Sequence, residues 1–162
     1  AVHLPQGGMP ALGDNPLFLG CADYRSTIAS NGESSGFTFP EEMRRHADKG
    51  TALVTDKDPG DAEIAEVVSQ AAAHSCIVLG TYNGHILQGQ LRLAKALAAT
   101  GLPMILVALR NPYDLRNMPN HVAALAGWEY TRPLFDALWP VLNGTARPTG
   151  KLPLLTLTKA AK

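Results

Sequence analysis

Residues 75–109, SCIVLGTYNGHILQGQLRLAKALAATGLPMILVAL, contain a complete strand–helix–strand unit. Its two ends, SCIVLG (75–80) and MILVAL (104–109), are continuous apolar runs, which are typical of parallel strands covered on both faces. An apolar stripe between them predicts a helix, and its members are Leu87, Leu91, Ala94 and Ala98. Gly101 suits the left-handed cap of that helix, and Pro103 follows just beyond it. The unit therefore predicts two parallel strands joined by a right-handed crossover.

Similar apolar runs on both sides extend this pattern to most of the chain. They are PLFLGC (16–21), TALVT (51–55), VAALAG (122–127) and a last expected strand at 152–157. Strands that alternate with helices predict an α/β fold, a three-layer αβα sandwich with a mostly parallel sheet of about five or six strands. The order of the strands does not follow from the sequence.

Three further helices have readable ends. One runs over 39–49 and ends at Gly50, and a second has Asp58 as its N-cap and Pro59 at its first helical position. The third runs over 132–142, with the N-cap Thr131 before it and the stop residues Asn143 and Gly144 after it.

The chain has 162 residues, which is the usual size of one domain. Residues 1–15 are rich in Gly and Pro and predict a linker or an extended arm, whereas 16–162 predict a single α/β sandwich domain. The stretch SNGESSG (30–36) is the most loop-like segment, and 24–30 before it fits a strand or a helix equally well.

The composition is that of a soluble globular protein, with 46% hydrophobic residues, 17% charged residues and a formal net charge of zero. A neutral chain has no overall field that would attract nucleic acid or an anionic membrane. The densest basic cluster, Arg44, Arg45 and Lys49, shares its helix with Glu41 and Glu42 and is interpreted as a solvated face. No apolar run is long enough to span a bilayer and no targeting segment is visible. The sequence therefore does not determine the cellular compartment of the protein.

Ligands of open α/β sheets usually bind beyond the carboxyl ends of the strands, so the loops that follow the strands hold the candidate site residues. These candidates for contacts with a substrate or a neighbouring domain are Tyr82, Asn83, His85, Arg110, Asn111, Asp114, Glu129 and Tyr130.

Two of these loops allow both a structural and a functional interpretation. Asn111, Pro112 and Asp114 fit a helix start, with Arg110 paired to Asp114; alternatively, the forked guanidinium of Arg110 faces a neighbouring domain or a ligand carboxylate. Glu129 lies between two aromatic residues, where desolvation would suit a general acid, but a structural role is preferred because no partner carboxylate is near in the sequence.

Other kinds of chemistry find little support. The five histidines lie in separate segments without metal-ligand spacing, no phosphate-binding glycine pattern follows a strand, and no cofactor is expected. Cys21 and Cys76 lie in apolar runs, where thiols behave as small hydrophobes, so neither is expected to be a nucleophile or part of a disulfide framework.

The stretches RNPYD (110–114) and NGTARPTGKLP (143–153) are the most specific motifs of the chain. With the segments around them, residues 16–157 resemble the C-terminal α/β sandwich domain of family 3 glycoside hydrolases. The likeness is strongest to the bacterial β-N-acetylglucosaminidase, or β-N-acetylhexosaminidase, branch.

This resemblance implies a split active site, in which an N-terminal barrel provides an aspartate nucleophile and the sandwich leans over it. In the β-glucosidase branch the sandwich supplies an acid/base glutamate from the loop that corresponds to 81–90, but that loop has no carboxylate here. In the N-acetylglucosaminidase branch a His/Asp pair of the barrel has this role. Retaining hydrolysis needs two carboxyl groups about 5 to 5.5 Å apart, so a chain without either should be inactive alone.

The resemblance therefore predicts an accessory domain of a glycosidase, without catalytic residues of its own. Its partners would be the barrel of the same enzyme and glycans that contain N-acetylglucosamine, and Tyr82, Asn83, His85 and Arg110 would stabilise the barrel or shape its entrance. One alternative is a freestanding module that binds a sugar or another small ligand, with Tyr82, Trp128 and Tyr130 stacking on the ring. A weaker one is an oligomerisation domain that buries the strand-end loops.

Overall fold

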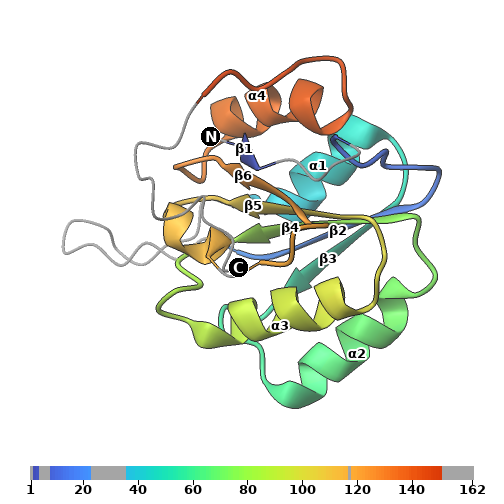
Figure 1. The fold of residues 1–162 in the computed structure, drawn as a ribbon, viewed down its shortest axis with the longest axis vertical. Coiled ribbons are helices and arrows are strands. Elements are labelled where there is room, and N and C mark those ends of the chain that lie inside the picture. Colours follow the sequence, from blue (N-terminus) through green and yellow to red (C-terminus); the bar gives the residue numbers. More distant parts are fainter. Residues whose placement is uncertain (1, 4–7, 23–35, 117, 151–162) are drawn as a thin grey trace.

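A six-stranded sheet forms the middle layer of the computed structural model, which describes residues 2–3, 8–22, 36–116 and 118–150 (Figure 1). Its strands are β1 (Val2–His3), β2 (Pro16–Cys21), β3 (Thr51–Thr55), β4 (Cys76–Thr81), β5 (Met104–Ala108) and β6 (Ala123–Ala126). They lie in the order β1-β6-β5-β4-β2-β3. Strands β2 to β6 pair in parallel, and β1 pairs antiparallel with β6.

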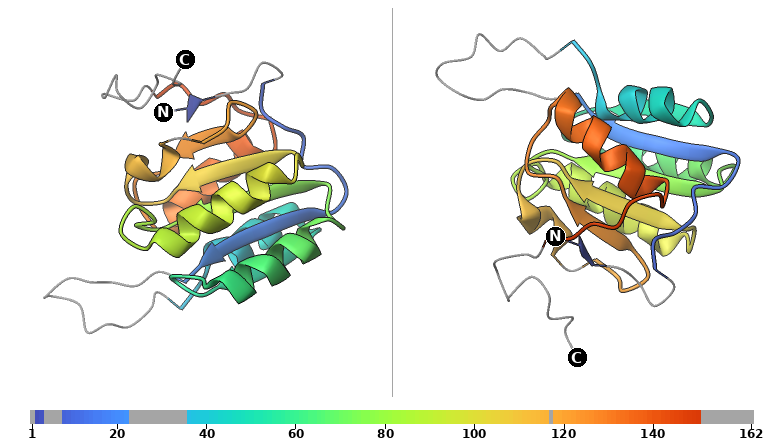
Figure 2. Two further views of the ribbon diagram at one scale, coloured as in Figure 1. Left: turned by 60° about the horizontal axis from the view of Figure 1, so that its bottom comes forward. Right: turned by 90° about the horizontal axis from the view of Figure 1, so that it is seen from above.

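Two helices cover each face of the sheet, so the predicted three-layer αβα sandwich is confirmed. Helices α1 (Phe39–Ala47) and α4 (Arg132–Leu142) lie above it in Figure 1, and α2 (Asp61–Ala71) and α3 (Gln88–Ala99) lie below it. Figure 2 shows the same layers from two other sides. A 3-10 helix, η1 (Pro112–Leu115), follows β5.

The strands of the sheet centre have continuous apolar sequences because helices cover both of their faces. Every residue of β2, β4 and β5 is buried. Alternate residues of β2 enter two separate cores, with Phe18 packed under α1 and α4 and Leu17 and Leu19 under α2 and α3. Strand β3 is more exposed because it lies at the end of the sheet.

The third predicted helix has the predicted ends. Helix α4 covers Arg132–Leu142, and the Thr131 hydroxyl accepts a hydrogen bond from the backbone N–H of Leu134 at 3.3 Å. Gly101 follows α3 with a φ of +75°, the left-handed conformation expected of a glycine after a helix.

The prediction of Asp58 as an N-cap is wrong. Helix α2 begins at Asp61, after Gly60. The Asp58 carboxylate instead accepts the backbone N–H of Gly89 at 2.7 Å, in the first turn of α3. Leu87, the N-cap residue of α3, makes no side-chain cap of its own, so Asp58 satisfies a free donor of a neighbouring helix.

Helix α1 is shorter than predicted. It ends at Ala47 because Asp48 already adopts the left-handed conformation, with a φ of 53°. On this helix Glu42 is buried rather than solvated and binds Arg45 and Arg132, which links α1 to α4. Burial alone would raise the pKa of Glu42, but the hydrogen bonds from both guanidinium groups outweigh it and hold the pKa below its ordinary value.

Parts of the predicted domain plan fall outside the described residues. These include the last expected strand at 152–157, the undecided stretch 24–30, and all of 30–36 except Gly36. Val2–His3 extends the sheet from within the predicted arm, but the division into 1–15 and 16–162 stays a prediction. Within the described ranges, no helix combines the length and apolar character required to cross a membrane.

Candidate functional site

The predicted site residues lie in three loops that follow β4, β5 and β6 at the carboxyl edge of the sheet. We call residues 82–87, 109–116 and 127–130 the strand-end rim. Neighbouring strands β4, β5 and β6 bring the loops together, since Thr81 pairs with Ala108 and Ala108 with Ala126 at the strand ends. Some of the predicted residues form a buried network of hydrogen bonds beneath the rim, which we call the buried support. Others lie on its exposed surface.

Asp114 is the centre of the buried support, because its side chain has no exposed surface. One carboxylate oxygen accepts the backbone N–H of Gly84 at 2.9 Å, and the other accepts the N–H of His85 at 2.7 Å. The second oxygen also lies 3.3 Å from Nδ1 of the His85 ring. Asp114 therefore holds the loop after β4 in place from the loop after β5.

Arg110 does not pair with Asp114, so this part of the local interpretation is wrong. The Arg110 guanidinium donates to the Tyr82 hydroxyl at 2.7 Å and lies 5.5 Å from the centre of the Tyr82 ring. In the described part of the chain, His85 is the one basic residue with a side-chain nitrogen within 4.0 Å of the Asp114 carboxylate. Asp114 thus binds another strand-end loop instead of a local arginine.

Asn111 stands at the N-cap position of η1, as predicted, but its side chain makes no cap. Its amide nitrogen donates to the Asn83 side-chain oxygen at 2.8 Å. Asn83 has a φ of 56°, a left-handed conformation that asparagine tolerates better than most residues, and its carbonyl accepts the N–H groups of Ile86 and Leu87. The amide pair thus ties together the loops after β4 and β5.

Gln90 completes the support, although the sequence did not identify it as a site residue. It is 3% exposed, accepts the N–H of Tyr82 at 2.8 Å and donates to the carbonyls of Tyr82 and Lys57. The available signal was a long polar side chain inside the apolar pattern of a helix. Such a side chain needs buried hydrogen-bond partners.

The two rim tyrosines are buried, with exposed fractions of 4% for Tyr82 and 6% for Tyr130. Their rings meet edge to face at 5.5 Å. The Tyr130 hydroxyl accepts the N–H of Phe39 at 2.7 Å and donates to the Cys21 carbonyl at 3.0 Å. Both phenols therefore belong to the core, and neither offers an open ring face on which a sugar could stack.

The exposed part of the rim includes large apolar and aromatic side chains, which lie among the exposed polar residues Arg110, Arg116 and Glu129. The described residues include four large hydrophobic side chains that are exposed, and three of these, Ile86, Tyr113 and Trp128, lie on the rim. Trp128 is 49% exposed and has a φ of +73°, an unusual conformation for a bulky residue.

The rim lacks the features of a hydrolytic centre. Glu129 is exposed, so the desolvation considered for it is not present. Asp114 is engaged by backbone N–H groups. Among the described residues no group of three or more His, Cys, Asp or Glu side chains could hold a metal ion.

The side chains of both cysteines, Cys21 and Cys76, are buried. Burial raises the pKa of Cys76 to about 12, although a contact with the Ile77 carbonyl acts in the opposite direction. Raising the pKa from 9.0 to about 12 leaves roughly a thousandfold less thiolate at neutral pH. Cys76 is thus unsuited to nucleophilic attack.

Thiol labelling checks this conclusion. In a Cys21→Ser variant, DTNB at about pH 8 should label the native protein at least 100-fold more slowly than the protein in concentrated guanidinium chloride, because the thiolate is the reacting species. Rapid labelling of the native variant would show a reactive Cys76.

No protein-family model matches the chain, and no curated protein matches it. Solved structures do. A family 3 β-N-acetylglucosaminidase from a Paenibacillus species matches with a TM-score of 0.78 and 23% identity, over 94% of this chain and 30% of its own. A fungal multi-domain family 3 β-N-acetylglucosaminidase matches 94% of this chain with a TM-score of 0.68 and 16% identity, over 17% of its own length.

A β-glucosidase from Listeria innocua matches 85% of this chain, with a TM-score of 0.64, 15% identity and 22% of its own length covered. The chain thus has the fold of one part of family 3 glycoside hydrolases, and the resemblance is confirmed at the level of the fold. It spans less than a third of the length of each of these enzymes.

Proposed function

We propose that the chain is an accessory α/β sandwich domain of a family 3 glycoside hydrolase and has no catalytic residues of its own. In the complete enzyme it would lie against a catalytic barrel that hydrolyses O-glycosyl bonds. The relevant activity would be that of a β-N-acetylhexosaminidase, acting on glycans that contain N-acetylglucosamine. The likeness to the Paenibacillus enzyme, which covers 94% of this chain and 30% of that one, supports this proposal.

The observation that carries the proposal is the concentration of exposed apolar side chains on the rim. Ile86, Tyr113 and Trp128 are 66%, 40% and 49% exposed, and all three follow the carboxyl ends of central strands. Exposed aromatic residues above a hydrogen-bonded support are typical of surfaces that become buried when a partner protein or domain binds. We infer that the rim faces the barrel, where His85 and Arg110 help to shape its entrance.

The binding-module alternative has less support. It requires Tyr82, Trp128 and Tyr130 to form a stacking platform, but two of these three rings are buried. An oligomerisation domain would also use the exposed rim, so the test has to separate a barrel from a second copy of the chain.

The test has two parts. The chain alone should not hydrolyse p-nitrophenyl N-acetyl-β-D-glucosaminide, because it supplies no pair of carboxyl groups at hydrolytic distance. The reading frame that encodes the chain should also encode a barrel domain with an aspartate nucleophile, and the two-domain polypeptide should be active. Turnover by the chain alone that a point substitution in it abolishes would contradict the proposal, as would dimerisation through the rim without any barrel.

A further inference from the structure

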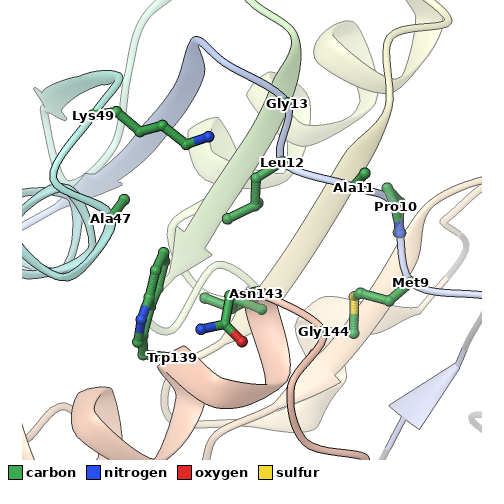
Figure 3. Close-up of a pocket in the computed structure, with 11 residues that line it drawn as sticks. Met9, Pro10, Ala11, Leu12, Gly13, Ala47, Lys49, Trp139, Asn143 and Gly144 are labelled. Carbon is green, nitrogen blue, oxygen red and sulfur yellow. The ribbon is translucent and has the colours of Figure 1, made fainter.

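A concave surface lies at the edge of the sheet opposite the rim. It is a pocket of about 390 Å³, formed where residues 9–13 pass beside the C-terminal ends of α1 and α4 (Figure 3). Its volume is in the usual range for pockets that hold small molecules. Since it uses neither the rim nor a barrel, an occupant would add a function beyond the proposed one.

Trp139 provides an aromatic wall of this pocket. The indole stacks on the His46 ring, with 5.9 Å between the ring centres and 14° between the planes, and His46 Nε2 in turn lies 3.0 Å from an Asp136 carboxylate oxygen. In Figure 3 Trp139 stands on one side of the pocket, while Leu12 and Met9 lie across from it. The pocket therefore presents an aromatic ring that stacks on the imidazole of the neighbouring helix α1.

Two polar side chains at the pocket can donate hydrogen bonds. Lys49 Nζ is 3.9 Å from a carboxylate oxygen of the fully exposed Asp14, a distance at which an exposed pair contributes little. The side-chain oxygen of Asn143 accepts from the backbone N–H and the hydroxyl of Thr145. Its amide nitrogen has no partner among the described residues and is available to a ligand.

The charges around the pocket favour a neutral ligand. Helix α1 ends at Ala47 and α4 at Leu142, and both residues line the pocket. The C-terminus of a helix carries a partial negative charge, so two such ends offset the positive charge of Lys49 and disfavour a carboxylate or a phosphate. The pocket thus offers a ligand the Trp139 ring and two hydrogen-bond donors, Lys49 and Asn143.

We propose that this pocket binds one neutral pyranose residue of a glycan. The C–H face of the ring would stack on Trp139, and its hydroxyl oxygens would accept hydrogen bonds from Lys49 and Asn143. An aromatic platform with a few convergent polar groups is a general arrangement for holding an amphipathic ring. The site would attach the protein to a glycan without taking part in bond cleavage.

Fluorescence tests this proposal, because the chain has two tryptophans. In a Trp128→Phe variant of the complete chain, Trp139 is the only tryptophan, and titration with chitotriose, a neutral oligosaccharide of N-acetylglucosamine, should change its emission saturably. Lys49→Met should weaken the binding at least fivefold. Lys95→Met, on the exposed side of α3, is the matched control and should leave it unchanged.

Calorimetry with Trp139→Ala supplies a second measurement, in which chitotriose binding should be lost. Glucuronate should bind no better than glucose, since the helix ends disfavour its charge. The proposal is wrong if chitotriose gives no saturable signal, or if Lys49→Met binds it as tightly as Lys95→Met. Neither result depends on hydrolysis, so the accessory-domain proposal would stand or fall separately.

Discussion

Replacing Asp114 with alanine is expected to lower the free energy of unfolding by about 3 kcal/mol, because buried donors lose a charged acceptor. The N–H groups of Gly84 and His85 both point at this carboxylate, whose side chain has no exposed surface. Chemical denaturation followed by circular dichroism measures the change. Hydrogen exchange should show faster exchange at the amides of Gly84 and His85 than in the wild type.

Asp114→Asn is the matched control for this substitution. The amide keeps the shape of the side chain and one accepting oxygen, but its nitrogen would face one of the two N–H donors. The free energy of unfolding of Asp114→Asn should therefore fall by less than that of the alanine variant, by about 1 to 2 kcal/mol. A loss below about 1 kcal/mol for the alanine variant would mean that the carboxylate does not hold the rim together.

The partners of Asp114 could not be predicted from the sequence. A carboxylate two residues after a proline is a good local helix signal, and Arg110 is a near neighbour, so the local interpretation was reasonable. The structure connects Asp114 to residues 29 and 30 positions away instead. Such a contact depends on the pairing of β4 with β5, which one sequence does not specify.

Asp58 and Gly89 give a second example of a contact between segments that are distant in the sequence. Asp58 precedes a helix and was interpreted as its cap, but its partner is 31 residues away. By contrast, β2 was predicted with its observed bounds, because burial on both faces leaves a continuous apolar run. Thr131 capped α4 as predicted, because that interaction is local. Periodicity and local capping were therefore predictable, and hydrogen bonds between loops were not.

The burial of Tyr82 and Tyr130 could not be predicted for a related reason. Tyrosine is found both in cores and on binding surfaces, because its ring is apolar and its hydroxyl is polar. Only the fold shows that Phe39 and Cys21, which are far away in the sequence, supply the backbone partners of the Tyr130 hydroxyl. The exposed Trp128 is the residue of that aromatic set that stays available to a partner.

Trp128→Gly should separate stability from docking more clearly than any other rim substitution. The φ of +73° is unfavourable for tryptophan and suits glycine. Relief of that strain opposes the loss of packing by a side chain that is already 49% exposed, so the free energy of unfolding should change by less than about 1 kcal/mol. Docking to the barrel should weaken at least about 30-fold, the loss expected when a central aromatic contact is removed.

The measurement is the dissociation constant between this chain and the separately expressed barrel that the accessory-domain proposal requires. Val54→Thr is the control, since Val54 is 43% exposed but lies on β3, away from the rim. It should dock like the wild type. If Trp128→Gly also docks like the wild type, or Val54→Thr weakens docking more, then the rim is not the interface. Backbone strain of this kind usually persists where a function depends on it. If Trp128 mediates no contact with the barrel, its strained conformation would therefore need another explanation.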